Sequence, residues 1–147
     1  MDLVYADTNV YLDWVQWRKG RGFLTHQGEE AEAFFNDVKA GKYRLLTSDH
    51  LEAQIKLHST PSQFQQYKDY IAELDKKSLH SHIIAKPAER QQANITAKSC
   101  NSEYEDALHF ELAKKGGAAI LITQDEPHFK AFAGQMKICR PRLITMI

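Results

Sequence analysis

Residues 1–14 read MDLVYADTNVYLDW, and the stretch that decides the fold runs from Leu3 to Asn9. Its apolar part, Leu3-Val4-Tyr5-Ala6, ends abruptly at Asp7-Thr8-Asn9, after which apolar residues resume. The apolar run predicts a short buried strand over 2–6, and the residues after it favour a helix over 8–17. Asp7 is therefore expected at the junction between a strand and a helix. Whether it belongs to a functional site depends on whether other acids are expected beside it.

The rest of the chain alternates strand patterns with helix patterns. Further strands are expected over 43–47, 82–85, 118–123 and 143–146, and further helices over 29–40, 49–58, 61–77, 87–98, 102–115 and 129–132. Thr60-Pro61 signals a helix start, Ser102-x-x-Glu105 has the form of a capping box, and residues 18–28 carry three glycines and favour a loop. The alternation predicts an α/β domain with a largely parallel central sheet.

Length and charge narrow the classes of protein. The 147 residues fit one domain, 1–147. Lys plus Arg and Asp plus Glu each total 19, so the zero net charge argues against binding nucleic acid by bulk charge alone. Local basic groups are Arg18-Lys19-Gly20-Arg21, Lys114-Lys115, and Lys137 with Arg140 and Arg142, for which scattered solvated charge is the simpler interpretation.

The expected cellular location follows from the lack of a membrane-helix or signal-peptide pattern in the sequence. No stretch approaches the roughly 18 apolar residues that a membrane helix needs, and Asp2 and Asp7 interrupt the apolar start. We expect a cytoplasmic protein without a membrane partner. Cys100 and Cys139 belong to no metal-ligand pattern, and reduced thiols are expected in the cytosol.

Four acids are expected at one edge of the predicted sheet. Asp7 and Asp125 follow strands, and ligands of open α/β sheets gather outside the carboxyl ends of the strands. Glu52 lies one turn into the helix after the second strand. Asp106 lies one turn into a helix that runs antiparallel to the strand it feeds, so its first turn reaches the same edge. The four carboxylates should therefore converge.

Such a cluster would repel itself unless a cation were shared. Like charges raise each other's pKa, and oxygen ligands suit Mg²⁺ or Mn²⁺. Four acids can hold one ion, or two ions about 4 Å apart, which lower the pKa of bound water and clamp a phosphodiester. Taken singly, each acid has a simpler interpretation, because acids favour the first turns of helices and Asp7 could cap the helix after it.

Four short motifs carry a resemblance to a known family. They are Tyr5-Ala6-Asp7-Thr8-Asn9-Val10, Thr47-Ser48-x-x-Leu51-Glu52, Asp106-Ala107-Leu108 followed by Ala113, and Leu121-Ile122-Thr123-x-Asp125. In order and spacing, over nearly the whole chain, they resemble the motifs of the PIN-domain ribonucleases, particularly the VapC-like toxins of toxin–antitoxin pairs. The resemblance implies a PIN-like, three-layer α/β/α domain with four to five strands.

The resemblance also implies an activity. It is that of a Mg²⁺- or Mn²⁺-dependent endoribonuclease in which Asp7, Glu52, Asp106 and Asp125 carry one or two ions and the activated water, with Asp7, Asp106 and Asp125 as metal ligands. Thr8, Asn9 and Thr123 would be polar supports that hydrogen-bond a carboxylate or water. The implied partners are an RNA substrate, an antitoxin that occludes the acid pocket, and a second copy in a homodimer. Placing an Arg among the carboxylates would be one physical means of occlusion.

Several alternatives stay open. Glu126 is an alternative to Asp125, because Glu126-Pro127-His128 precedes the next aromatic, and His128 can approach the acids. Glu103 and Glu105 flank Asp106, which is preferred because it shares a helix face with Phe110 and Ala113. A non-catalytic PIN-fold module that binds RNA or protein is the second candidate function.

Other readings find less support. A haloacid-dehalogenase site needs an acid at position 9, which is Asn, and His80-Ser81-His82 lacks a third zinc ligand. Those histidines are expected to be solvated or hydrogen-bonded. The aromatic residues are expected in the core or facing a partner; they are Trp14, Trp17, Phe34 and Phe35. No base-stacking platform and no RNA target can be read from the sequence.

Overall fold

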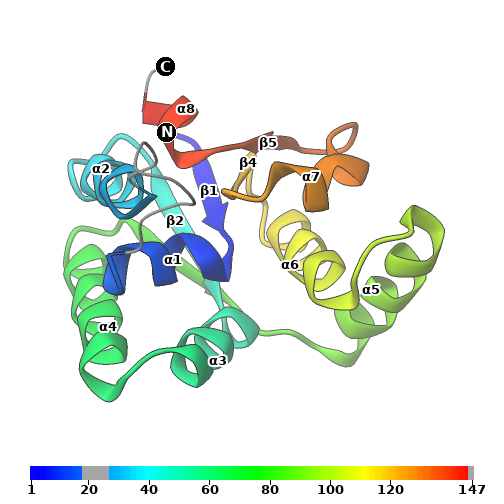
Figure 1. The fold of residues 1–147 in the computed structure, drawn as a ribbon, viewed down its shortest axis with the longest axis horizontal. Helices are drawn as coiled ribbons and strands as arrows, with labels where there is room; N and C mark the ends of the chain where they lie inside the picture. The colour runs from blue at the N-terminus through cyan, green and yellow to red at the C-terminus, as the bar shows by residue number, and fades with distance from the viewer. Residues whose placement is uncertain (18–26, 146–147) are drawn as a thin grey trace.

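The computed structural model describes residues 1–17 and 27–145. The predicted loop over 18–28 falls, up to residue 26, outside the described residues, as does the basic group at 18–21. Figure 1 shows the strands β1 (Leu3–Ala6), β2 (Arg44–Ser48), β3 (His80–Ile83), β4 (Ile120–Ile122) and β5 (Lys137–Cys139). The helices are α1 (Thr8–Val15), α2 (Gln27–Lys39), α3 (Asp49–His58), α4 (Pro61–Lys76), α5 (Pro87–Cys100), α6 (Tyr104–Lys115), α7 (Glu126–Phe129) and α8 (Pro141–Thr145), with a 3₁₀ turn at Lys130–Phe132.

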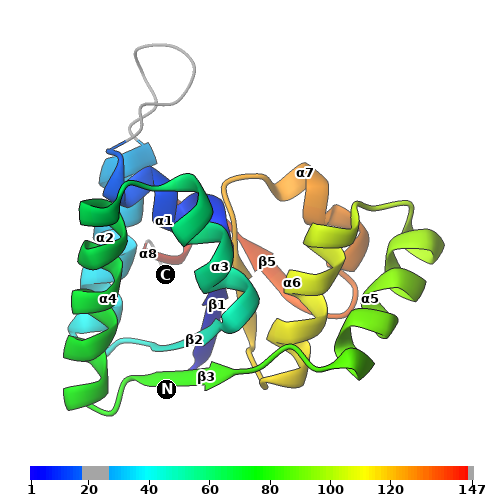
Figure 2. The same cartoon turned by 90° about the horizontal axis from the view of Figure 1, so that it is seen from below.

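The sheet has five strands in the order β3-β2-β1-β4-β5, and every neighbouring pair is parallel. Figure 2 shows α2 and α4 on one side of the sheet and α5 and α6 on the other. This arrangement confirms the predicted three-layer α/β/α domain.

The strand order reverses at the border between β1 and β4. The chain first adds β2 and β3 on one side of β1, and then returns to place β4 and β5 on the other side. The backbone N–H of Asp7 donates to the carbonyl of Ile122 across this border, at 3.0 Å. In open α/β sheets such a reversal leaves a crevice at the carboxyl ends of the strands, which is where ligands bind.

An aromatic cluster joins the helices α1, α2 and α4. Phe34 and Phe35 are buried, and Trp14 lies 4.7 Å from Phe35 and 5.0 Å from Tyr70 between ring centroids. The contacts of Trp14 hold α1 against α2 and α4. The first residues of α1 follow the carboxyl end of β1. Trp17 is 46% exposed. The predicted core role therefore holds for Phe34 and Phe35, whereas Trp14 is half-buried against the core.

Gly116 lets α6 return closely to the sheet. A Cβ at this position would lie 2.3 Å from Cδ2 of Leu46 on β2, so the turn after α6 leaves no room for a larger residue. Gly117 follows with φ of +84°, a conformation that favours glycine. These two residues begin the connection from α6 to β4.

The strand predicted over 143–146 is wrong for residues 143–145, and residue 146 lies outside the described residues. Residues 141–145 form α8, and the last strand is Lys137–Cys139. Pro141 begins α8, where its missing N–H costs no hydrogen bond, whereas Pro is poorly suited to continue a strand. The strand predicted over 82–85 begins two residues earlier, at His80.

The predicted capping box at the start of α6 is also wrong. Glu103 is the N-cap and makes no side-chain capping bond, while the Ser102 hydroxyl is buried without a hydrogen-bond partner in the described structure. Glu105 accepts instead from Gln54 Nε2, at 2.9 Å. The tertiary hydrogen bond to Gln54 thus replaces the capping bond that Glu105 was predicted to make within its own helix.

Two further features can be stated of the described residues. Cys100 and Cys139 are both free thiols, as expected. None of the described helices combines the length and the apolar character that a bilayer crossing requires.

Candidate active site

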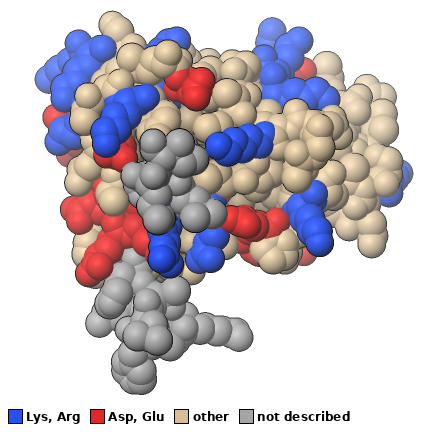
Figure 3. Space-filling view, turned by 90° about the horizontal axis from the view of Figure 1, so that it is seen from above, with Lys and Arg blue, Asp and Glu red and all other residues tan. Residues whose placement is uncertain are grey.

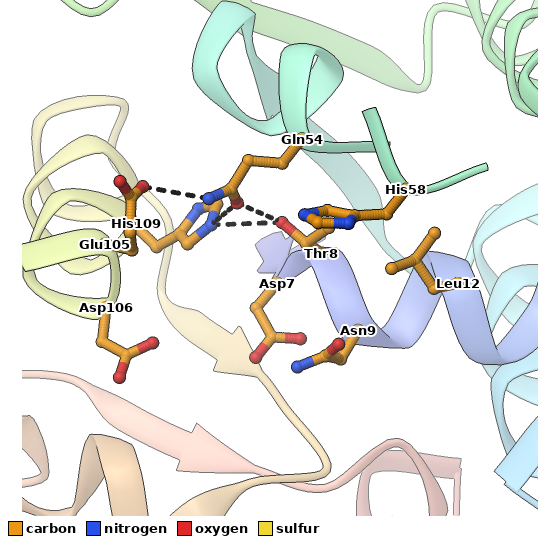
Figure 4. Close-up of a pocket in the computed structure, with 9 residues that line it drawn as sticks. All are labelled: Asp7, Thr8, Asn9, Leu12, Gln54, His58, Glu105, Asp106 and His109. Atoms are coloured by element: carbon orange, nitrogen blue, oxygen red, sulfur yellow. Dashed lines mark hydrogen bonds between the residues drawn. The ribbon is translucent and has the colours of Figure 1, made fainter. Parts of the chain in front are cut away.

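A pocket of about 270 Å³ opens at the reversal of the strand order. Figure 4 shows the residues that line it, which come from three elements far apart in sequence. They are Asp7, Thr8, Asn9 and Leu12 at the start of α1, Gln54 and His58 on α3, and Glu105, Asp106 and His109 on α6.

Asp7 forms the buried floor of the pocket. Its Oδ2 accepts from Thr123 Oγ1 at 2.7 Å, and its Oδ1 accepts from the backbone N–H of Val10 at 3.3 Å. Asp7 therefore caps α1, as the simpler interpretation expected, and also faces the pocket. Its pKa is raised to about 7, chiefly by burial; the two hydrogen bonds act in the opposite direction, and the charge of Asp106 adds to the rise.

Asp106 faces Asp7 from the first turn of α6. Its side chain is 19% exposed. Partial burial raises its pKa to about 6, helped by the charges of Glu103 and Asp125, while His128 acts in the opposite direction. Two carboxylates with raised pKa values thus meet across a pocket, although 99 positions separate them in the sequence.

Asp125 lies beside this pair but outside the pocket lining. Its backbone N–H donates to Thr123 Oγ1 at 2.9 Å, so one hydroxyl connects it with Asp7. His128 Nδ1 lies 2.7 Å from Asp125 Oδ2 and 3.8 Å from Asp106 Oδ2. His128 does approach the acids, and it stands between Asp125 and Asp106.

Glu52 is not brought to the other acids, which corrects the predicted convergence of four carboxylates. Its Oε2 accepts from the Tyr67 hydroxyl at 2.9 Å, and its Oε1 lies 3.9 Å from His82 Nε2. Both contacts place the side chain beside α4 and β3, and Glu52 does not line the pocket. The helix turns Gln54 toward the pocket instead.

Gln54 and His109 are pocket residues that sequence reasoning missed. Gln54 Oε1 accepts from Thr8 Oγ1 at 2.5 Å and lies 2.8 Å from His109 Nε2. His109 Nδ1 in turn lies 2.7 Å from the Tyr5 hydroxyl. Complete burial lowers the pKa of His109 to about 3, so the ring is neutral at pH 7.

The helical period carried a signal for both residues. Gln54 and His58 follow the buried Leu51 by three and seven positions, which places all three on one face of α3. His109 follows Asp106 by three positions and shares its face of α6. Buried apolar neighbours therefore mark the inward face more reliably than the presence of an acid does.

The predicted polar supports have three different outcomes. Thr123 donates to the Asp7 carboxylate, as expected of a support. The Thr8 hydroxyl donates to Gln54 rather than to an acid, and Asn9 lines the pocket. The alternative acids Glu103 and Glu126 border other hollows, whereas Glu105 lines this one.

The His80-Ser81-His82 pair is hydrogen-bonded, as expected. Thr47 Oγ1 lies 2.6 Å from His80 Nε2 and 2.7 Å from His82 Nδ1. In the part of the chain that the structure describes, no three or more His, Cys, Asp or Glu side chains form a group that could hold a metal ion as they stand. The pair Asp7 and Asp106 is thus the centre of the acidic site.

Basic charge is dispersed on one face of the molecule (Figure 3). On the face shown in Figure 3, Lys and Arg side chains stand in separate groups with other residues between them. This view agrees with the sequence-based interpretation of scattered solvated charge.

Comparison with known proteins gives a likeness of fold. No family model matches the sequence, and no curated protein does either. Among solved structures, a chain in the crystal structure of FitAcB from Neisseria gonorrhoeae is similar, with a TM-score of 0.56 and 17% sequence identity. The match covers 94% of this chain and 97% of that chain. At this identity the likeness shows a shared PIN-like fold, and it leaves activity to be argued from the pocket.

Proposed function

We propose that this protein is a metal-dependent endoribonuclease that hydrolyses RNA phosphodiester bonds. The observation that carries the proposal is the meeting of Asp7 and Asp106 in one pocket at the carboxyl edge of a parallel sheet. Both carboxylates have raised pKa values, so each gains from a nearby positive charge. The PIN-like fold and the motif resemblance favour the same activity.

The donor set fits one Mg²⁺ or Mn²⁺ ion between Asp7 and Asp106. Mg²⁺ in proteins commonly takes one or two carboxylates and keeps several waters, so two acids suffice. When bound, such an ion lowers the pKa of water and offsets charge on the phosphodiester oxygens. Asp125 would join only after exchanging its 2.7 Å contact with His128.

The protein's own residues would position the reactants. Thr123 and the Val10 N–H fix the Asp7 carboxylate, so its oxygens keep one orientation in the pocket. Asp106 lies opposite and would orient the attacking water by accepting its hydrogen bond. Low exposure around Asp7, which is 4% exposed, strengthens each of these interactions.

The test compares cleavage of a defined RNA panel in Mg²⁺, Mn²⁺ and EDTA. Asp7→Asn and Asp106→Asn should each lower the rate by about 10²-fold or more, the scale of losing one catalytic group. Asp69→Asn is the matched control, because Asp69 is exposed on α4 and pairs with Gln65. Cleavage that persists in EDTA, or in both pocket variants, rejects the proposal.

A non-catalytic module that binds RNA or protein is the second candidate. The position of Glu52 favours it, because this acid contacts Tyr67 rather than the pocket. This candidate is supported if RNA binds without being cleaved in either metal.

The proposed biological setting is that of a toxin in a toxin–antitoxin pair. We propose a cytoplasmic VapC-like toxin that forms a homodimer. Its antitoxin would block the pocket by placing an Arg between Asp7 and Asp106, where two carboxylates can accept from its guanidinium. Co-expression with a candidate antitoxin, followed by crosslinking to the pocket, tests that partner.

A further inference from the structure

The pocket has a second wall that the proposed hydrolysis leaves unused. Asp7 and Asp106 lie on one side, and Gln54, His58 and Leu12 form the opposite side (Figure 4). We call these three residues, which belong to α1 and α3, the α1–α3 wall. Its polar groups are an amide and an imidazole, so this wall carries no carboxylate.

Neighbouring groups fix the orientation of the Gln54 amide. A carboxylate only accepts hydrogen bonds, so the group that faces Glu105 Oε2 at 2.9 Å is the amide nitrogen of Gln54. The amide oxygen consequently faces Thr8 Oγ1 and His109 Nε2. The reversed orientation would set two oxygens against each other at Glu105.

The same logic fixes His109. Because Nε2 faces an amide oxygen it carries the proton, and Nδ1 accepts from the Tyr5 hydroxyl. Tyr5 is itself held by Ser48 at 3.0 Å. A buried chain of hydrogen bonds thus runs from β1 to Gln54 and prevents the amide from turning over.

Gln54 is left with one hydrogen-bonding group for a ligand. Its oxygen already accepts twice, and one of its two N–H groups donates to Glu105. The remaining N–H can donate to a molecule in the pocket that Gln54 lines. Glu105, Asp7 and Asp106 surround this donor, so an uncharged acceptor such as a carbonyl oxygen suits it better than an anion does.

The wall also offers a surface for stacking. His58 is exposed and its ring borders the pocket beside Leu12 (Figure 4). Unpaired RNA bases stack on aromatic side chains, including His, and are read along their hydrogen-bonding edges. The 270 Å³ pocket is smaller than the roughly 300–1,000 Å³ of sites for drug-sized ligands, so it suits a single nucleoside unit.

We propose that the α1–α3 wall binds one base of single-stranded RNA, stacked on His58, with the Gln54 amide donating to the carbonyl at C4 of uracil or C6 of guanine. This inference rests on the proposed ribonuclease function and names its substrate contact. Uracil and guanine carry a carbonyl where cytosine and adenine carry an amino group, which is a donor. The wall therefore selects the bases with a carbonyl at this position, uracil and guanine.

Nucleoside binding tests this selection without metal or cleavage. ¹H–¹⁵N spectra of the metal-free protein are recorded with uridine against cytidine and with inosine against adenosine, since each pair exchanges a carbonyl for an amino group. Uridine and inosine should shift the Gln54 side-chain amide signal and bind about tenfold more tightly than their partners. Gln54→Leu should erase the difference, with Gln54→Met as a second variant if the first fails to fold.

Gln65→Leu is the matched control, because Gln65 is an exposed glutamine on α4 outside the pocket. This variant should keep the tenfold difference. Equal binding within each pair, no binding of any of the four nucleosides, or discrimination that survives in both Gln54 variants overturns the proposal.

A cleavage assay separates this inference from the proposed function. RNAs that differ at one base are cleaved in Mn²⁺, and the wild type should prefer uracil or guanine beside the cleaved bond, whereas Gln54→Leu should not. Cleavage without that preference overturns the base contact and leaves the ribonuclease standing. Nucleoside discrimination with no cleavage of any RNA retains the base contact and rejects the ribonuclease.

Discussion

Asp7 is a buried carboxylate whose pKa is raised from 3.8 to about 7, chiefly by burial. Because the folded-state pKa is the higher one, the folded protein holds its proton at pH values where the unfolded chain has lost it. In EDTA, wild-type stability should therefore fall as pH rises from about 4 through 7. Urea unfolding across this range measures the trend.

Asp7→Asn should remove the part of that fall that Asp7 causes, and leave the smaller part that Asp106, with its pKa of about 6, contributes. An amide oxygen can still accept from Thr123 and Val10, while the buried charge disappears. At pH 8 the variant should be more stable than the wild type by up to about 4 kcal/mol, at about 1.4 kcal/mol per pKa unit. At pH 4 the difference should nearly vanish. Equal stability of the two proteins at pH 8 would show that burial does not raise the pKa of Asp7.

Gln54 lines the same pocket as Asp7 and Asp106. Gln54→Glu should raise the affinity for Mn²⁺ by about tenfold, because it adds a negative ligand to a pocket already lined by Asp7, Glu105 and Asp106. The new carboxylate would also face Glu105, so the two acids would gain from sharing a cation. Isothermal titration measures this change. Glu52→Gln should leave the affinity within about twofold, since Glu52 contacts Tyr67 outside the pocket. The reverse pattern would identify Glu52 as the ligand.

The positions of Asp7 and Asp106 in the pocket could be predicted from the sequence, but that of Glu52 could not. The reason is that the sequence did not show which side of α3 faces the pocket. Asp7 ends a strand, so its position is fixed along the strand axis by the end of the apolar run. On α3 each residue turns by about 100°, and Glu52 and Gln54 point in nearly opposite directions. Which of them faces inward depends on the packing of Leu51 and Ile55, both of which are buried.

At the scale of elements, α4 shows the clearest local signal. Thr60 Oγ1 accepts from the N–H of Gln63 at 3.2 Å, and the Gln63 side chain accepts from the Thr60 N–H at 2.9 Å. Thr60→Ala should lower the free energy of unfolding by about 1 kcal/mol. Chemical denaturation measures it, with Ser62→Ala in the same turn as control. If Ser62→Ala lowers the free energy of unfolding as much as Thr60→Ala does, the Thr60 cap does not stabilise α4 specifically.

Most elements could be predicted because their patterns are local, whereas the exceptions depend on distant contacts. The strand Lys137–Cys139 is short and partly exposed, so it has no apolar run, and its pairing with β4 makes it a strand. The segment at 143–146 has β-forming residues, yet Pro141 starts a helix there. At α6, Glu105 hydrogen-bonds Gln54 across the pocket instead of capping its own helix.

At the scale of the whole molecule, equal numbers of acidic and basic residues set how RNA would be held. With 19 of each sign, and with Lys and Arg in separate groups on the face shown in Figure 3, few phosphates would be neutralised at once. The slope of log affinity against log salt should therefore be shallow, about −2 or less steep, at roughly −0.7 per phosphate for a single strand. Fluorescence anisotropy with Asp7→Asn in Ca²⁺ measures it without cleavage. A slope near −5 would reveal a continuous basic track.

The parallel sheet and its edge could be anticipated from alternation alone, because a strand followed by a helix returns in the same direction. The strand order could not, since β1 contains nothing that states which later strand will pair with it. The reversal at β1 and β4 is nevertheless what brings Asp7 and Asp125 within reach of one hydroxyl, Thr123 Oγ1.

The central place of β1 also has a consequence for how the fold comes apart. β3 and β5 are edge strands and can fray in small, frequent openings, whereas β1 is paired on both sides. The Asp7 amide, bonded to Ile122, should therefore exchange with deuterium only when the entire domain unfolds. The Asp7 carboxylate would therefore keep its position while the edge strands β3 and β5 open locally, and such openings would not disrupt the pocket.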